Sequence, residues 1–142
     1  MKRKAKGLNA ERDLVKIFHS NGWAPLRVAG SGSSPIPLPD ILAGNGERNL
    51  ALECKTTRKN TIYISHEQID QLLYFAYKFG AEPWLAIRFY RKPWIFYRVS
   101  EMTKTEKSYS ASIEDPIIGR TFFQLIGITE NEDNKNNKET DN

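Results

Sequence analysis

Two carboxylates and a lysine stand close together in the sequence, each within or directly before an apolar segment. Asp40 leads into the apolar run Ile41–Ala43, and Glu53 and Lys55 lie two residues apart in the next apolar run. Side chains at positions i and i+2 of a strand project to the same face, so Glu53 and Lys55 point together while Cys54 points the opposite way. If the two strands are neighbours, Asp40 joins this group. The set predicts a Mg²⁺ site with a positive charge beside its bound water.

The ordinary alternative for these residues is a strand end with solvated charges. Apolar residues closely bracket Glu53, and a charge in a buried strand is costly unless it has a partner or a task. We therefore favour the metal site. Cys54 is the single cysteine and is expected to fill the core of a reduced protein, because one cysteine with His19 and His66 cannot build a zinc framework.

The composition predicts one domain with a basic body. The chain has 142 residues, and no apolar run is long enough to span a bilayer, so we expect a cytoplasmic protein with no membrane contact. Five acidic and two basic side chains in residues 129–142 give −3, which leaves +7 for residues 1–128 out of a net +4. Residues 1–128 are expected to form the domain, and the polar tail 129–142 to be disordered. A basic body favours nucleic acid as partner, although charge alone also fits a protein that binds no polyanion.

Helices and strands can be placed around the candidate site from periodicity and turn signals. The expected segments are a mobile basic arm at Met1–Lys6, a helix at Asn9–Asn21, strands at Trp23–Val28, Ile41–Ala43, Asn49–Lys55 and Thr61–Ile64, a helix from Ser65 to Phe79, strands at Trp84–Tyr90 and Trp94–Val99, and a short helix or strand at Thr121–Gly127. Pro25 indicates an edge strand, Asn45-Gly46 a hairpin turn, and Ser65 with Gln68 a helix capping box. Residues 100–119 give no clear pattern.

Three further features bear on function. Residues 29–39 combine glycines, serines and prolines directly before Asp40, which favours an active-site loop over a plain connector. Tyr74 and Phe75 widen the apolar arc of the second helix, and such a helix lies between layers or contacts another subunit. Glu11, in the first turn of the first expected helix, has an ordinary explanation because it complements the helix dipole.

The order of these features resembles a known nuclease family. Pro39-Asp40, twelve intervening residues and Glu53-Cys54-Lys55 resemble the PD-(D/E)xK nuclease motif. Further blocks resemble the archaeal Holliday-junction resolvases, in the order Asn9–Val15, Arg27–Ile41, Ala43–Gly46 and Leu72–Gly80. The resemblance runs from about Lys6 to Val99, and the C-terminal third departs from the family. It implies an α/β fold of the restriction-endonuclease type, with a central mixed β-sheet flanked by helices.

The resemblance also implies an activity and a set of catalytic residues. The enzyme would be a homodimer that cuts four-way DNA junctions by paired phosphodiester hydrolysis, with Mg²⁺ or with Mn²⁺ in its place, and with no small-molecule cofactor. Asp40 and Glu53 would be metal ligands, joined by the main-chain carbonyl of Cys54 and, directly or through water, by Glu11. Lys55 would orient the attacking water and stabilise charge on the phosphate. This reading replaces the helix-dipole explanation of Glu11.

Residues around the catalytic group also have implied roles. Ser31 matches a functional loop serine near the scissile phosphate, and Gln68 is a candidate neighbour of Lys55. The candidates for DNA contact are Lys4, Lys6, Arg12, Arg27, Arg58 and Lys59. The candidates for the dimer interface are Leu72, Phe75 and Phe79.

Three other functions remain open at this point. The same chemistry would serve a restriction- or repair-type nuclease that cuts duplex DNA. A non-catalytic DNA-binding relative is a second possibility, although the complete set of catalytic candidates argues against it. An interaction protein that docks through Phe75 and Phe79 is the third.

Overall fold

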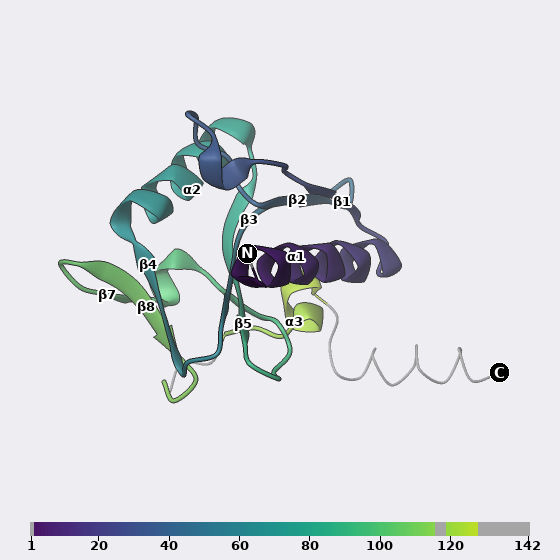
Figure 1. The fold of residues 1–142 in the computed structure, drawn as a ribbon. Coiled ribbons are helices and arrows are strands. Elements are labelled where there is room, and N and C mark those ends of the chain that lie inside the picture. The colour runs from purple at the N-terminus through teal and green to yellow at the C-terminus, as the bar shows by residue number, and fades with distance from the viewer. Residues whose placement is uncertain (1, 116–118, 128–142) are drawn as a thin grey trace.

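The computed structural model describes residues 2–115 and 119–127, with side chains from Lys6 onward; the expected tail at 129–142 lies outside the described residues. Its helices are α1 (Lys2–Ser20), α2 (His66–Phe79) and α3 (Phe122–Ile126), with short 3₁₀ turns η1 (Ser31–Ser33) and η2 (Val99–Glu101). Its strands are β1 (Ala24–Arg27), β2 (Ile41–Gly44), β3 (Asn49–Thr57), β4 (Thr61–Ser65), β5 (Glu82–Phe89), β6 (Ile95–Tyr97), β7 (Thr103–Lys104) and β8 (Ser108–Ser112). Figure 1 shows their arrangement.

A mixed five-stranded sheet forms the centre of the described chain, in the order β1-β2-β3-β5-β6. β3 and β5 run parallel, whereas the other neighbouring pairs are antiparallel. β1 lies at the edge, where Pro25 costs no ladder hydrogen bond on the open side. The expected α/β architecture, a mixed sheet flanked by helices, is therefore confirmed.

Two apolar clusters hold the helices to the two faces of this sheet. One cluster packs α1 and α3 against the sheet, through residues that include Leu14, Phe18 and Leu125. The other packs α2 and a small second sheet, β4-β8-β7, against the opposite face, through residues that include Ile69 and Ile87. α1 and α2 accordingly lie on different sides of β3 in Figure 1.

Local turn chemistry fixes the strands and helices next to the candidate site. The Asn45 side chain accepts hydrogen bonds from the main-chain N–H groups of Glu47 and Arg48, at 2.9 and 2.7 Å, which closes the hairpin between β2 and β3. The capping box at the start of α2 is present, because the Gln68 N–H donates to Ser65 Oγ at 3.1 Å and the Ser65 N–H donates to Gln68 Oε1. Both turns were expected from the sequence.

The first helix differs from the expectation in its start. α1 begins at Lys2, so the mobile arm expected at Met1–Lys6 is wrong for Lys2–Lys6, and Asn9 lies inside the helix instead of capping it. Lysine, arginine and alanine are good helix formers, and nothing before Gly7 interrupts them. The helix therefore begins about two turns before the amphipathic segment that marks it in the sequence.

Residues 100–119, which gave no pattern in the sequence, supply most of the second sheet. β8 pairs with β4 and with the short strand β7 in the described part of this segment. The final segment is a helix, with Thr121 accepting the N–H of Gln124 as its N-terminal cap. None of the described helices is both long enough and apolar enough to span a bilayer.

Candidate active site

Asp40 is the centre of the candidate site and is held by hydrogen bonds to β3, to η1 and to Val28 after the end of β1. Its main-chain N–H donates to the Leu52 carbonyl at 2.9 Å, and its own carbonyl accepts from the Val28 N–H at 2.8 Å. Its side chain accepts from Ser31 Oγ at 2.7 Å on one oxygen and from the Cys54 N–H at 2.8 Å on the other. Among the described residues it is the one charged side chain that is almost fully buried, so these bonds stabilise a carboxylate that water reaches only slightly.

Glu53 and Lys55 lie on β3 and point to the same side of it. Lys55 Nζ lies 3.9 Å from Glu53 Oε1, and both side chains are about three-quarters or more buried. Cys54 points to the other face, where it packs against the cluster beneath α1, and burial raises the pKa of its thiol. The alternation expected for a strand is therefore present, and the expectation that Cys54 packs against the core is confirmed.

Glu11 reaches the same place from α1. Its side chain is 19% exposed, and its Oε2 lies 3.9 Å from Arg27 Nη1 on β1. Burial is the main cause that raises the pKa of Glu11 to about 7, followed by repulsion from Asp40, while Arg27 opposes the change. Glu11 therefore lies close enough to Asp40 to be repelled by it, and because α1 begins at Lys2, Glu11 is not in the first turn of the helix.

The pKa of Glu53 is raised further, to about 8. Burial is the largest cause, followed by the Asp40 carboxylate; Lys55 lowers the pKa, and Glu11 and a hydrogen bond to Asp40 raise it. Three carboxyl groups thus share a space too small and dry for three negative charges. Such a group gains stability from protons or from a bound cation.

The donor chemistry of this group fits a hard divalent cation. Its donors are carboxylate oxygens, and each Asp40 oxygen keeps a lone pair besides the hydrogen bond that it accepts. In the described ranges no three acidic, histidine or cysteine side chains stand in the compact arrangement of ligands around a bound ion. Glu53 forms a hydrogen bond with Asp40 and is repelled by Glu11, so the three carboxyl groups lie near one another.

Ser31 and Gln68, which were expected near the scissile phosphate and near Lys55, form hydrogen bonds with other residues. Ser31, in η1, donates to Asp40 and so acts on the carboxylate itself. Gln68 Oε1 accepts the Ser65 N–H at 3.4 Å, so the capping box accounts for this side chain. Within the described part of the chain, Gln68 forms no hydrogen bond with Lys55.

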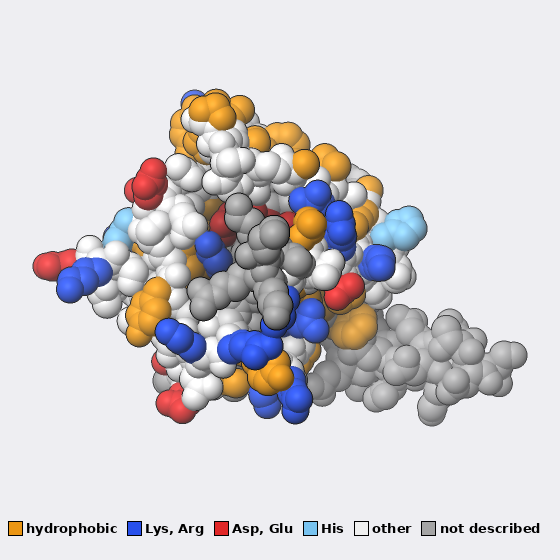
Figure 2. Space-filling view, viewed as in Figure 1, with side chains coloured by type: hydrophobic (Ala, Val, Ile, Leu, Met, Phe, Trp, Pro, Cys, Tyr) orange, Lys and Arg blue, Asp and Glu red, His pale blue; other side chains and the backbone are white. Residues whose placement is uncertain are grey.

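The basic candidates are not equivalent. Arg27 faces Glu11, whereas Arg12, Lys6 and Lys59 are exposed. Arg58 stacks on Tyr90, with its guanidinium carbon 5.0 Å from the ring centroid. Lys4 belongs to α1, but its side chain lies outside the described part. On the face shown in Figure 2, lysine and arginine side chains surround a small acidic area near the middle.

The candidates for the dimer interface differ in how exposed they are. Phe79 is 57% exposed, and its ring stacks on that of Phe75 at 5.2 Å between centroids. Leu72 is buried in the core of the protomer, so its assignment to a subunit interface is wrong. Leu72 lies on the side of α2 that faces the sheet, whereas Tyr74 and Tyr77 are exposed. Helical periodicity predicts which side chains of α2 are apolar neighbours, but packing against the sheet determines which of them are buried in the protomer.

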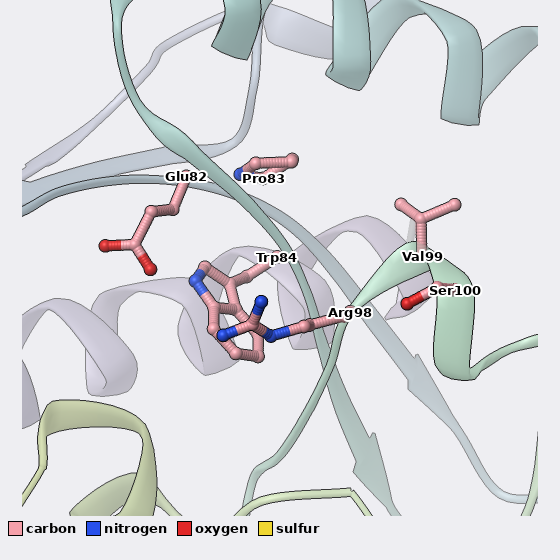
Figure 3. A pocket seen from close by; sticks show the side chains of 6 residues that line it. All are labelled: Glu82, Pro83, Trp84, Arg98, Val99 and Ser100. Carbon is pink, nitrogen blue, oxygen red and sulfur yellow. The ribbon is translucent and has the colours of Figure 1, made fainter.

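A separate hollow contains none of the candidate catalytic residues (Figure 3). It is lined by Glu82, Pro83, Trp84, Arg98, Val99 and Ser100. Its charged groups already have partners. Arg48 makes two hydrogen bonds to Glu82, at 2.8 and 2.9 Å, and the Arg98 guanidinium lies over the Trp84 ring.

Sequence reasoning placed a connection between these two strands but did not single out Tyr90 and Arg91 in the turn between β5 and β6. Tyr90 and Arg91 lie there beside Arg58, although they are more than thirty residues away in the chain. The available signal was the run Tyr90-Arg91-Lys92 between two strands. Only the parallel pairing of β3 with β5 brings that run to Arg58.

Comparisons with known proteins agree with this geometry. Residues 2–133 match the family described as archaeal Holliday junction resolvase (Hjc). The crossover junction endodeoxyribonuclease Hjc of Archaeoglobus fulgidus is 41% identical over 128 residues, which cover 85% of this chain and 94% of that protein. Its counterpart of the same name in Methanocaldococcus jannaschii is 33% identical, over 86% of this chain and 87% of that protein.

A solved structure extends the agreement to the fold. The structure of Archaeoglobus fulgidus Hjc, a Holliday junction resolvase from an archaeal hyperthermophile, matches this chain with a TM-score of 0.79 and 39% sequence identity. The match covers 84% of this chain and 97% of that one. By family match, sequence identity and fold together, the chain belongs to the archaeal Holliday junction resolvase (Hjc) family.

Proposed function

We propose that this protein is a metal-dependent endonuclease that resolves four-way DNA junctions by paired phosphodiester hydrolysis. The observation that carries the proposal is the convergence of Glu11, Asp40 and Glu53 beside Lys55 in a member of the Hjc family. Relatives named crossover junction endodeoxyribonucleases match nearly the whole described chain. The protein would act on recombination and repair intermediates in the cytoplasm.

The metal would be Mg²⁺, with Mn²⁺ able to replace it. Asp40, Glu53 and Glu11 would hold it, together with the carbonyl oxygen of Cys54. When bound, such a cation lowers the pKa of coordinated water and offsets negative charge on the reacting phosphate. The raised pKa values of Glu11 and Glu53 support this assignment, because burial and then repulsion from Asp40 disfavour their ionised forms, and a bound cation would offset both effects.

The protein's own groups would then position the reaction. Ser31 and the Cys54 N–H fix both oxygens of Asp40, so this carboxylate has a defined direction before DNA arrives. Lys55 holds a positive charge beside Glu53, where it can orient water and stabilise charge that develops on the phosphate. Arg27 partly offsets the effects that raise the pKa of Glu11, and Arg12, which is exposed, would contact DNA.

Junction selectivity would come from two sites held at a fixed separation. A symmetric dimer presents two equal sites to the two cleaved strands, and phosphate contacts do not need to read bases. The exposed ring of Phe79, stacked on Phe75, is the proposed centre of the subunit contact. No small-molecule cofactor is required by this scheme.

The deciding experiment compares a four-way junction with linear duplexes of the same arm sequences. The expected result is Mg²⁺-dependent cleavage of the junction alone, in a symmetric pair of strands. Equal cleavage of the linear duplexes would indicate a restriction- or repair-type nuclease instead. Binding without any cleavage at all would indicate a non-catalytic relative.

A pair of variants links that activity to the site. Asp40→Asn should abolish cleavage and keep junction binding, because basic contacts to phosphates supply most of the affinity. Glu106→Gln is the matched control, since Glu106 is exposed in the turn between β7 and β8. Full activity in Asp40→Asn would refute the site assignment.

A further inference from the structure

The turn between β5 and β6 carries an unusual backbone conformation. The Lys92 N–H donates to the Phe89 carbonyl at 3.0 Å, which closes a tight turn with Tyr90 and Arg91 at its centre. Arg91 has φ of 58°, and it is the sole residue other than glycine with a positive φ in the described ranges. Glycine adopts this left-handed conformation with least strain, and side chains held there often mark a functional site.

Tyr90 joins this turn to the loop after β3. The guanidinium carbons of Arg58 and Arg91 lie 5.0 and 5.1 Å from the centroid of the Tyr90 ring. Both are within the range of a cation–π contact, and the ring itself is half exposed. One aromatic ring therefore holds two cations from different loops at the surface.

The charges around Tyr90 have no acidic partners in the described structure. Arg58, Lys59, Arg91 and Lys92 are all exposed, and none of them takes part in the ion pairs formed between described residues. We call these four residues, with Tyr90, the Tyr90 cluster. Its two loops lie at the lower edge of the molecule in Figure 1, below β5, and that region of Figure 2 is rich in lysine and arginine.

The Tyr90 cluster lies along the same strands as the candidate active site. Lys55 is paired with Ile87 and Thr57 with Phe89, so Arg58 and Tyr90 follow directly where the two strands end. Arg58 is three positions beyond Lys55, which corresponds to roughly 10 Å along an extended chain. That distance equals about three base steps along one DNA strand.

We propose that the Tyr90 cluster binds the phosphodiester backbone of the duplex arm next to the cleaved phosphate. Unpaired guanidinium groups at fixed positions suit phosphate oxygens, which they can contact through two hydrogen bonds at once. Tyr90 acts as a positioning residue that keeps Arg58 and Arg91 directed outward. That the bound DNA is an arm of a four-way junction rests on the proposed function, whereas the contact to the backbone of a duplex does not.

The test measures affinity for a labelled four-way junction in EDTA, at several salt concentrations between 50 and 200 mM, so that binding is separated from cleavage. Each lost phosphate contact should make the log–log salt dependence shallower by about 0.9 per protomer. When salt rises from 50 to 200 mM, a variant that lacks one phosphate contact should therefore lose about 3.5-fold less affinity than the wild type loses.

Arg91→Gly is the most informative variant, because it removes the cation and also relieves the left-handed backbone. We expect a melting temperature no lower than that of the wild type, weaker junction binding at low salt, and the shallower salt dependence. Tyr90→Ala should weaken binding as well, and Tyr90→Phe, which keeps the ring, should restore most of that loss. Lys107→Ala, an exposed cation in the turn between β7 and β8, is the charge-matched control.

Two results would overturn the proposal. One is a salt dependence in Arg91→Gly equal to that of the wild type, with or without a lower melting temperature. The other is an equal change in Lys107→Ala, which would show a general effect of charge. If the wild type failed to cut junctions while Arg91→Gly still lost a phosphate contact, the proposed function would fail and this inference would stand.

Discussion

Replacing Glu53 by glutamine should change how the stability of the metal-free protein depends on pH. The pKa of Glu53 is raised from 4.5 to about 8, chiefly by burial and then by Asp40. Between these two values the folded protein holds a proton that the unfolded chain has lost. The free energy of unfolding therefore falls as the pH rises through this window, and it levels off above about pH 8.

The size of this effect follows from the difference between the two pKa values. At 1.36 kcal/mol for each pKa unit, a rise from 4.5 to about 8 corresponds to an upper limit on the order of 5 kcal/mol. Glutamine has nearly the shape of a protonated glutamate and does not titrate. The variant and the wild type should therefore be similar at pH 5, and Glu53→Gln should be more stable by about 3 to 5 kcal/mol near pH 8.5.

Urea unfolding in EDTA, repeated from pH 5 to pH 8.5, measures this difference directly. Glu106→Gln is the control and should follow the wild type, because that side chain is exposed. Adding Mg²⁺ at pH 8.5 should raise the stability of the wild type more than that of Glu53→Gln. The reasoning is refuted if Glu53→Gln is destabilised by the same amount at every pH, since the carboxyl group would then be stabilised by its charge.

Three other substitutions test separate parts of the structure. Ser31→Ala removes the 2.7 Å hydrogen bond to Asp40 and should slow single-turnover cleavage by about 10- to 100-fold without weakening junction binding, as a gel-shift and a quench assay would show. Phe79→Glu should give a monomer in sedimentation and lose paired incision, and an unchanged dimer would exclude the Phe79 contact. Ser65→Ala removes the N-terminal cap of α2 and should cost about 1 kcal/mol in urea unfolding, whereas a cost near zero would show that the capping box adds nothing.

The sequence predicts the centre of this fold well because its signals there are local. Asn45-Gly46 fixes the β2–β3 hairpin, and that hairpin alone places Asp40 beside the strand that carries Glu53. Strand alternation then puts Glu53 and Lys55 on one side. Glu11 could be assigned only through the family resemblance, since its contact with Arg27 joins α1 to β1 across the fold.

What the sequence could not predict depends on pairing between distant segments. β4 has a partner only because β8 returns to it from the segment that showed no pattern. Leu72 is buried because of the way α2 packs against the sheet, and helical periodicity alone does not predict that packing. The Tyr90 cluster exists because two parallel strands end together, which no local spacing reveals.

The position of Asp40 has a consequence for local opening of the protein. Its carbonyl, its N–H and its carboxylate bond to Val28, Leu52 and Cys54, so the amide protons of Val28, Asp40 and Cys54 all depend on one residue. These amides should exchange with deuterium at a common rate, as one cooperative unit. Hydrogen exchange at these positions would thus report how often the Asp40 carboxylate leaves its place, without any need for DNA or for turnover.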